Sequence, residues 1–297
     1  MTNETSPARL YIVITDFNGW DQTKVCLHRL QASSCQEFSV IVVDHGTTDE
    51  TANGLTEFPS CIRISADSDL WWTGAINKGI RKAMELGATR VMLLNNDCYV
   101  NHSTVSRVLQ HLSDEQKQVV APLQRNLDAK ILVARTGTCF TLGFPTFVLP
   151  YMKRIPNPKG GLVATEMIVG GRGVVIPAEV FDAVGLFDED ALPHYGADHD
   201  FYMRCRAQGI PLFVASNASV EIDDTRSTVA RDLGAMNWNQ FRQSLQNPRS
   251  HRNITMLTTL FKRHYPIKSL YLVGVALNLA RYFGSYLGAR SAYFLTK

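Results

Sequence analysis

Acidic residues terminate apolar segments at three places in this 297-residue chain. A carboxylate at the end of a buried strand can bind a divalent cation, and a carboxylate at the start of a helix can accept a proton. Turns and helix caps use the same residue types for structural reasons. The acidic residues concerned are Asp44 with Asp49, Asp97, and Asp198 with Asp200.

Asp97 carries the clearest chemical signal. The apolar residues 91–94 end abruptly in Asn95, Asn96 and Asp97, as expected for a buried strand followed by a polar turn. Open α/β sheets bind their ligands at the carboxyl ends of the strands, where this triplet would lie. We therefore expect Asp97 to bind a divalent metal, Mn²⁺ or Mg²⁺, against a diphosphate. The alternative is a strand that ends in an Asx turn.

The elements that would position these residues alternate between strands and helices. Short apolar runs predict strands at residues 10–14, 38–43, 61–65 and 91–94, and helical spacing predicts helices at residues 23–32 and 74–86. This order predicts βαβ units, and so an α/β fold with a mostly parallel nucleotide-binding sheet flanked by helices. No G-x-G-x-x-G segment follows the first strand, which disfavours a dinucleotide-binding Rossmann site.

After Asp97 the alternation of strands and helices becomes less regular. We expect a helix at residues 101–112, an irregular proline-rich loop near the site at 145–161, a glycine-led strand at 170–177 and a helical turn at 180–185. A further helix begins in the polar cluster at residues 194–201 and ends at Gly209. Asp198 would lie at its start, where the helix dipole favours the ionised carboxylate.

Composition restricts the class of protein. Hydrophobic residues make up 45% of the chain and charged residues 19%, which allows a sizeable core and disfavours general disorder. The six cysteines include no C-x-x-C pair, which argues against a zinc site and against a disulfide framework. The first nine residues are polar, so we expect no export signal and a cytoplasmic location.

Four segments of the chain contain most of the candidate residues: V-V-D-H-G-T-T-D (42–49), D-L-W-W-T-G-A-I-N-K-G-I (69–80), L-N-N-D (94–97) and L-P-H-Y-G-A-D-H-D-F (192–201). In the same order they resemble segments of a family 2 glycosyltransferase with the GT-A fold, and the resemblance covers roughly residues 9–220. The second segment is similar to the N-x-W-W-T-G-A-x-N-x-G segment of rhamnosyltransferase-like members. The third occupies the place of the D-x-D metal motif, and the fourth resembles the late E-D-x-D-F segment.

The resemblance assigns roles to particular residues. Asp44 would contact the nucleotide base, Asp97 would bind the metal, and Asp198 would be the general base that deprotonates the acceptor hydroxyl. On the acceptor side the candidates are His194, His199 and Asp200. The donor-binding candidates are Thr15, Asp16, Asp44, Asp69, Trp72, Gly74, Asn77 and Asn96.

Two positions depart from the family pattern. Asn95 stands where the D-x-D motif begins with Asp, so Asp97 is the only anionic ligand in that segment, and the metal could bind weakly or be dispensable. Ala197 replaces the usual Glu beside Asp198, which leaves the neighbouring histidines and Asp200 as alternative bases. A non-catalytic protein that binds sugar nucleotides or polysaccharides therefore remains an alternative interpretation. A nucleotidyltransferase is disfavoured because residues 15–20 contain no Lys or Arg.

The C-terminal segment differs in charge from the rest. Residues 225–297 contain eleven Lys or Arg and one acid, Asp232, so we expect a catalytic domain at 1–225 and a basic helical extension at 226–297. The uncharged run at 269–280 is too short to span a bilayer. An anionic membrane surface, the catalytic domain or a second copy of the chain could cover this helix, and nucleic acid is not expected. Its small residues recur every four positions: Ala276, Ala280, Gly284, Gly288 and Ala292.

The resemblance thus implies an inverting, metal-assisted hexosyltransferase. Its donor would be a nucleotide-diphospho-sugar, with rhamnose as the sugar on the basis of the tryptophan-containing segment alone. Its acceptor would be a glycan or a lipid-linked sugar in the synthesis of a surface polysaccharide such as O-antigen. The basic extension would allow a peripheral location on the cytoplasmic face of the inner membrane.

Overall fold

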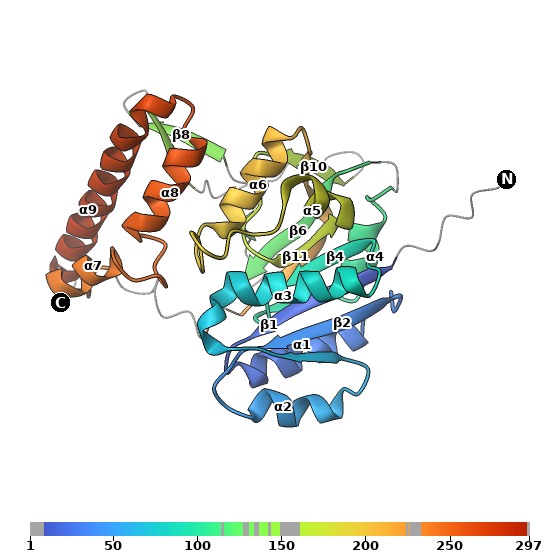
Figure 1. The fold of residues 1–297 in the computed structure, drawn as a ribbon. Helices are drawn as coiled ribbons and strands as arrows, with labels where there is room; N and C mark the ends of the chain where they lie inside the picture. Colours follow the sequence, from blue (N-terminus) through green and yellow to red (C-terminus); the bar gives the residue numbers. More distant parts are fainter. Residues whose placement is uncertain are drawn as a thin grey trace.

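A ten-stranded mixed sheet forms the centre of the part of the chain that the computed structural model describes (Figure 1). The described residues are 9–113, 116–126, 131–133, 137–141, 144–148, 161–223, 225 and 233–295. The strands of this sheet are β1 (Leu10–Asp16), β2 (Phe38–Asp44), β3 (Ile62–Ser65), β4 (Arg90–Leu94), β5 (Cys98–Val100), β6 (Val119–Asn126), β7 (Ile131–Val133), β10 (Leu162–Thr165), β11 (Arg172–Pro177) and β12 (Leu212–Ile222). They lie in the order β10-β12-β6-β11-β4-β1-β2-β3, with β5 paired to β12 and β7 to β6.

Helices cover both faces of the sheet because alternate strand residues point to opposite sides. Val13 and Ile41 are fully buried in one apolar cluster with residues of α3, α5 and α6. Ile12 and Ile14 are fully buried in a second cluster with residues of α1 and α4. The helices of this part of the chain are α1 (Trp20–Gln31), α2 (Glu50–Gly54), α3 (Trp71–Glu85), α4 (Thr104–Leu109), α5 (Ala178–Val184) and α6 (Ala197–Ala207).

The first four strands are parallel to one another. β1 lies between β2 and β4, and β3 pairs with the outer edge of β2. In this register Asp16 at the end of β1 stands opposite Asp44 at the end of β2. The carboxyl ends of these strands therefore lie at one edge of the sheet, as the alternation of strands and helices predicted.

The second half of the chain makes the sheet mixed. β11 lies between β4 and β6 and is antiparallel to both, with a bulge between Arg172 and Val174. Gly173 at this bulge has φ +81°, a backbone angle that favours glycine. The expected irregular loop at 145–161 is wrong in its first residues. They belong to β9 (Phe144–Val148), which pairs with β8 (Gly137–Thr141), and the remainder of that loop lies outside the described residues except for Gly161.

Three helices complete the described chain: α7 (Trp238–Ser244), α8 (Ile254–His264) and α9 (Tyr271–Leu295). The helices α8 and α9 lie side by side at one end of the molecule (Figure 1) and share a small core of Leu257, Phe261, Tyr265 and Val275. Asn237 and Asn253 cap α7 and α8 through side-chain hydrogen bonds to backbone N–H groups. Among the described helices, none has both the length and the apolar character needed to cross a membrane.

Candidate active site

A pocket of about 340 Å³ opens at the carboxyl ends of β1, β2 and β4. It is the position at which open α/β sheets bind ligands. Of the residues that we predicted to take part, the pocket wall includes Thr15, Trp72, Asn96, Asp97 and His194. The other residues of the wall are Phe17, Gln22, His45, Ser68, Trp71, Asn95, Asp223 and Arg249.

Two carboxylates lie on this wall. The backbone N–H of Asp223 donates a hydrogen bond to the carbonyl oxygen of Asp97 at 2.8 Å, so the two residues are held together where β4 and β12 end. Burial raises the pKa of the Asp97 carboxyl, against the opposing effect of the Arg172 guanidinium. Burial would also raise the pKa of Asp223, but hydrogen bonds, first among them that from Thr225, lower it to about 2. A bound cation would compensate for the cost of burying the Asp97 charge.

The residues at the ends of β1 and β2 have partners within the protein. Asp16 is fully buried and accepts hydrogen bonds from the Gly19 backbone, at 2.8 Å, and from the Thr23 hydroxyl. Asp44 accepts two hydrogen bonds from Arg63, at 3.0 Å from Nε and 2.8 Å from Nη2. Of these predicted donor-binding residues, Asp16 thus secures the turn after β1, and Asp44 forms a unit with Arg63.

The segment at the start of α3 supplies one predicted residue to the pocket and others to the scaffold. Trp72 donates a hydrogen bond from Nε1 to the Asn95 side-chain oxygen at 3.1 Å, and both residues line the pocket. Asn77 is fully buried, and its side chain exchanges hydrogen bonds with the Phe187 backbone at 2.8 and 3.1 Å. Asp69 is exposed before α3, and Gly74 faces Leu70 and Glu189.

Two histidines on the wall are held in the neutral form. Burial is the main cause that lowers the pKa of His194, to about 4, and the positive charge of Arg249 adds to it. Burial also lowers the pKa of His45. Within the described residues, the Nδ1 atoms of both rings are buried without a hydrogen-bond partner. These nitrogens are therefore available to a ligand, since buried polar atoms normally have a partner.

Asp198 lies in the first turn of α6, as predicted. The helix begins after Gly196, and the Asp198 Oδ2 atom accepts a hydrogen bond from the Gly170 backbone at 2.7 Å. His199 is next to it, with Nε2 at 3.9 Å from the same oxygen. Neither residue is part of the pocket wall, although the charge of Asp198 raises the pKa of His194 against the larger effect of burial.

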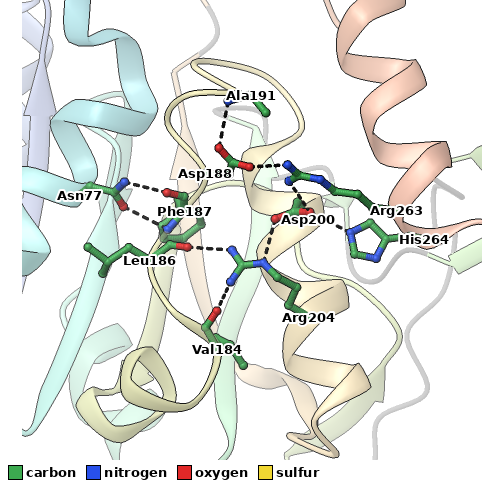
Figure 2. A network of polar contacts seen from close by, with 10 residues as sticks. All are labelled: Asn77, Val184, Leu186, Phe187, Asp188, Ala191, Asp200, Arg204, Arg263 and His264. Carbon is green, nitrogen blue, oxygen red and sulfur yellow. Dashed lines mark hydrogen bonds and ion pairs between the residues drawn. The ribbon is translucent and has the colours of Figure 1, made fainter.

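Asp200 belongs to a buried network of charges (Figure 2). Its carboxylate is fully buried and binds Arg204 at 2.8 Å, Arg263 at 3.2 Å and His264 at 2.8 Å. Burial would raise its pKa, but hydrogen bonds from His264, Arg204 and Arg263 lower it to about 2. The network also includes Asp188, which binds Arg263. This arrangement leaves Asp200 no access to an acceptor.

Comparison with known proteins decides the family. The model of the family described as Glycosyl transferase family 2 matches residues 11–163, slightly more than half of the chain. The chain belongs to glycosyl transferase family 2. The family and the fold suggested by the four sequence segments are thereby confirmed.

Several known proteins are similar to this family 2 chain at low sequence identity, in sequence or in fold. It is 20% identical to the dTDP-rhamnosyl transferase RfbF of Shigella flexneri over 213 residues, which is 70% of this chain and 66% of that protein, slightly less than two thirds. The mannosyltransferase PcManGT of Pyrobaculum calidifontis, in complex with GDP-Man and Mn²⁺, aligns with a TM-score of 0.57 and 13% identity over 97% of this chain and 76% of that one. GalNAc-T7, with UDP, GalNAc and Mn²⁺, aligns with a TM-score of 0.58 and 16% identity over 72% of this chain and 44% of that one.

The pocket wall offers two carboxylates, which are ligands that suit a hard divalent cation. Mg²⁺ and Mn²⁺ prefer oxygen ligands and, at phosphate-binding sites, one or two carboxylates with water and phosphate oxygens. Asp97 and Asp223 are the two carboxylates on the wall. Among the described residues no group of three or more His, Cys, Asp or Glu side chains is placed to hold a metal. The fit is thus to a cation that is shared with a phosphate ligand.

Sequence reasoning missed several residues of the family 2 pocket. Asp223 directly follows the strand β12, but this strand mixes apolar with polar residues and lacks the uninterrupted apolar run that precedes Asn95. His45 lies in the V-V-D-H-G-T-T-D segment but carried no role. Arg249 gave no local signal, because it belongs to the C-terminal segment and reaches the pocket only through the tertiary fold.

Proposed function

We propose that the protein is an inverting glycosyltransferase that moves a sugar from a nucleotide-diphospho-sugar to a hydroxyl of a glycan or lipid-linked acceptor. One observation carries the proposal: Asp97 and Asp223 lie together on the wall of a pocket at the carboxyl ends of parallel strands. A diphosphate with a divalent cation matches such a pair of carboxylates. Membership of glycosyl transferase family 2 supports the same chemistry.

In this proposal Asp97 and Asp223 hold the cation, which when bound neutralises the charge that develops on the departing diphosphate. Asp198 takes the proton from the acceptor hydroxyl as the new bond to the sugar forms and the bond to the diphosphate breaks. The Gly170 N–H, which donates a hydrogen bond to Asp198 at 2.7 Å, orients this carboxylate. Neutral His194 contacts the acceptor or the sugar.

The donor in this proposal lies along the ends of β1, β2 and β4. In this proposal the nucleobase lies next to the paired side chains of Asp44 and Arg63, and Thr15 lies on the adjoining wall of the pocket. Rhamnose is the proposed sugar, because the relative of Shigella flexneri is named a dTDP-rhamnosyl transferase and the segment around Trp72 resembles rhamnosyltransferase-like members. A surface polysaccharide such as O-antigen is the proposed product.

A thermal-shift experiment tests the proposal. UDP-, GDP- and dTDP-sugars, each with Mn²⁺ and with EDTA, are added to the wild type, to Asp97→Asn and to the control Asp182→Asn, which is exposed in α5. A ligand at 100 times its Kd stabilises the folded state by about 2.7 kcal/mol. We expect selective, metal-dependent stabilisation in the wild type and in Asp182→Asn, lost in Asp97→Asn. Stabilisation without sugar transfer to any acceptor would favour the non-catalytic binding protein.

We also propose that α9 docks on an anionic membrane surface, which would bring the site to a lipid-linked acceptor. Large apolar residues of α9 are exposed, and the segment around it is strongly basic. Flotation with vesicles containing an anionic lipid tests this, with Leu272→Ser combined with Leu287→Ser as the variant. We expect the wild type to float and the variant to float less. A dimer in solution that the variant dissociates, without flotation of the wild type, would contradict membrane docking.

A further inference from the structure

Arg249 reaches the pocket from a distant part of the chain. It lies in the short connection between α7 and α8, whereas the other residues of the wall come from positions up to Asp223. Its guanidinium carbon lies 5.5 Å from the centre of the Phe17 ring and 5.2 Å from the centre of the Trp71 ring. Both distances are typical of cation–π contacts, so two aromatic faces position this cation at the pocket.

The backbone around Arg249 is fixed by hydrogen bonds. The Arg249 N–H donates to the Asn247 side chain at 2.8 Å, and the Ser250 N–H donates to the Asn247 carbonyl at 3.0 Å. Asn253 donates to the Gln246 carbonyl at 2.9 Å while it caps α8. The loop therefore holds a defined conformation at the pocket.

The charged network of Figure 2 fixes the same segment to the catalytic part of the chain. Arg263 and His264 of α8 bind Asp200 of α6, and Arg263 also binds Asp188. The helix that follows the Arg249 loop is thus joined to the helix that carries Asp198. These contacts join the segment that carries Arg249 to the part of the chain that forms the rest of the pocket wall.

The guanidinium of Arg249 is available to an anion. Among the described residues, no carboxylate forms an ion pair with it, whereas Arg63 and Arg263 are both paired with aspartates. Trp71, beneath it, has φ +52°, an angle that is strained for a bulky residue. Such strain persists where the surrounding structure enforces it, often at ligand sites. The planar fork of arginine matches the oxygen atoms of a phosphate, and stacking on rings keeps it in place.

We propose that Arg249 binds the diphosphate of the nucleotide donor, so that the C-terminal helices complete the donor site. This inference rests on the proposed function. In the site Arg249 would stand on the side of Phe17 and Trp71, and the carboxylates Asp97 and Asp223 with their cation would stand on the side of β4 and β12. The diphosphate would lie between a fixed guanidinium and a bound metal ion.

Calorimetric titration with a series of ligands tests the inference. The series is nucleoside, nucleoside monophosphate and nucleoside diphosphate of uridine, thymidine and guanosine, with Mn²⁺ and again with EDTA. The proteins are the wild type, Arg249→Ala, Arg249→Lys and the control Arg242→Ala, which removes an exposed arginine of α7 outside the pocket. Circular dichroism confirms that each variant is folded.

For the nucleotide that binds the wild type, we expect the gain in affinity from nucleoside to diphosphate to fall at least tenfold in Arg249→Ala. Arg249→Lys should restore part of it, and Arg242→Ala should resemble the wild type. The inference is overturned if Arg249→Ala keeps the full gain in affinity from nucleoside to diphosphate. It is also overturned if the variant loses affinity for the nucleoside by the same factor as for the diphosphate. If the wild type binds no nucleotide, the proposed function itself fails and the inference fails with it.

Discussion

Asp198 accepts a hydrogen bond from the Gly170 backbone, whereas Asp200, two residues later in the first turn of α6, is enclosed by Arg204, Arg263 and His264. The same helical turn thus carries the proposed base and the carboxylate that joins α6 to α8. Substitutions at the two aspartates should therefore affect different properties of the protein.

Asp198→Asn should lower the rate of sugar transfer by about 100-fold or more, because general-base catalysis contributes roughly that factor. The amide oxygen can still accept the hydrogen bond from Gly170, so stability should change little. Kinetics with saturating donor, together with the melting temperature, measure the two effects. A variant with wild-type kcat would exclude Asp198 as the base.

Asp200→Asn should lower the free energy of unfolding by about 3 kcal/mol, because breaking a buried ion pair leaves uncompensated charges. Its partners are Arg204, Arg263 and His264, and its own carboxylate is fully buried. Urea denaturation of this variant beside the exposed control Asp190→Asn measures the difference. Equal midpoints in the two variants would contradict the structural role of the network.

The pH dependence of stability should reflect His194. Its pKa is about 4 in the folded protein and about 6.5 when unfolded, so the unfolded state binds more protons between these values. Stability should therefore fall by about 3 kcal/mol as the pH drops from 6.5 to 4. In His194→Asn the slope in this window should be smaller. Urea denaturation at several pH values measures it, and an unchanged slope would show that His194 does not contribute.

Gly79→Ala should destabilise the protein by about 1–3 kcal/mol through overpacking. A Cβ atom at this position would lie 2.2 Å from Val13 Cγ1 and 3.0 Å from Val43 Cγ2, so α3 would have to move away from the sheet. Gly288→Ala is the matched control, because no atom lies within 4 Å of a Cβ atom there. In α9 this change should stabilise by about 0.5–1 kcal/mol. Urea denaturation of both variants tests the contrast, and similar stability changes would contradict it.

The parallel half of the fold was predictable because local pattern and tertiary structure agree there. Buried runs such as the one in β4 are apolar throughout, and the helices between the strands have clear periodicity. Asp97 could be placed at the pocket because it follows a central strand, and ligands bind at the carboxyl ends of the strands in such a sheet. The helix α6 begins at Ala197, within the polar cluster at 194–201 that predicted its start.

The remainder of the site depends on contacts between distant residues, which the local sequence does not predict. Nothing in the sequence around Asp200 distinguishes a catalytic carboxylate from one that binds Arg263 and His264, residues more than sixty positions away. The same holds for Arg249, whose aromatic partner Phe17 lies at the other end of the chain. Asn77 resembled a donor ligand by motif but is occupied by the backbone of Phe187.

The position of β11 has a consequence for the order in which the protein can assemble during synthesis. This strand lies between β4 and β6, so the sheet of β1 to β4 cannot be joined to β6 until residue 177 has left the ribosome. Up to that point β4 and β6 expose edges that can pair with other chains. The wall of the pocket, which includes Asp223 and Arg249, is complete only when nearly the whole chain has emerged. A nascent fragment that ends before β11 would therefore lack both the strand that joins β4 to β6 and part of the pocket wall.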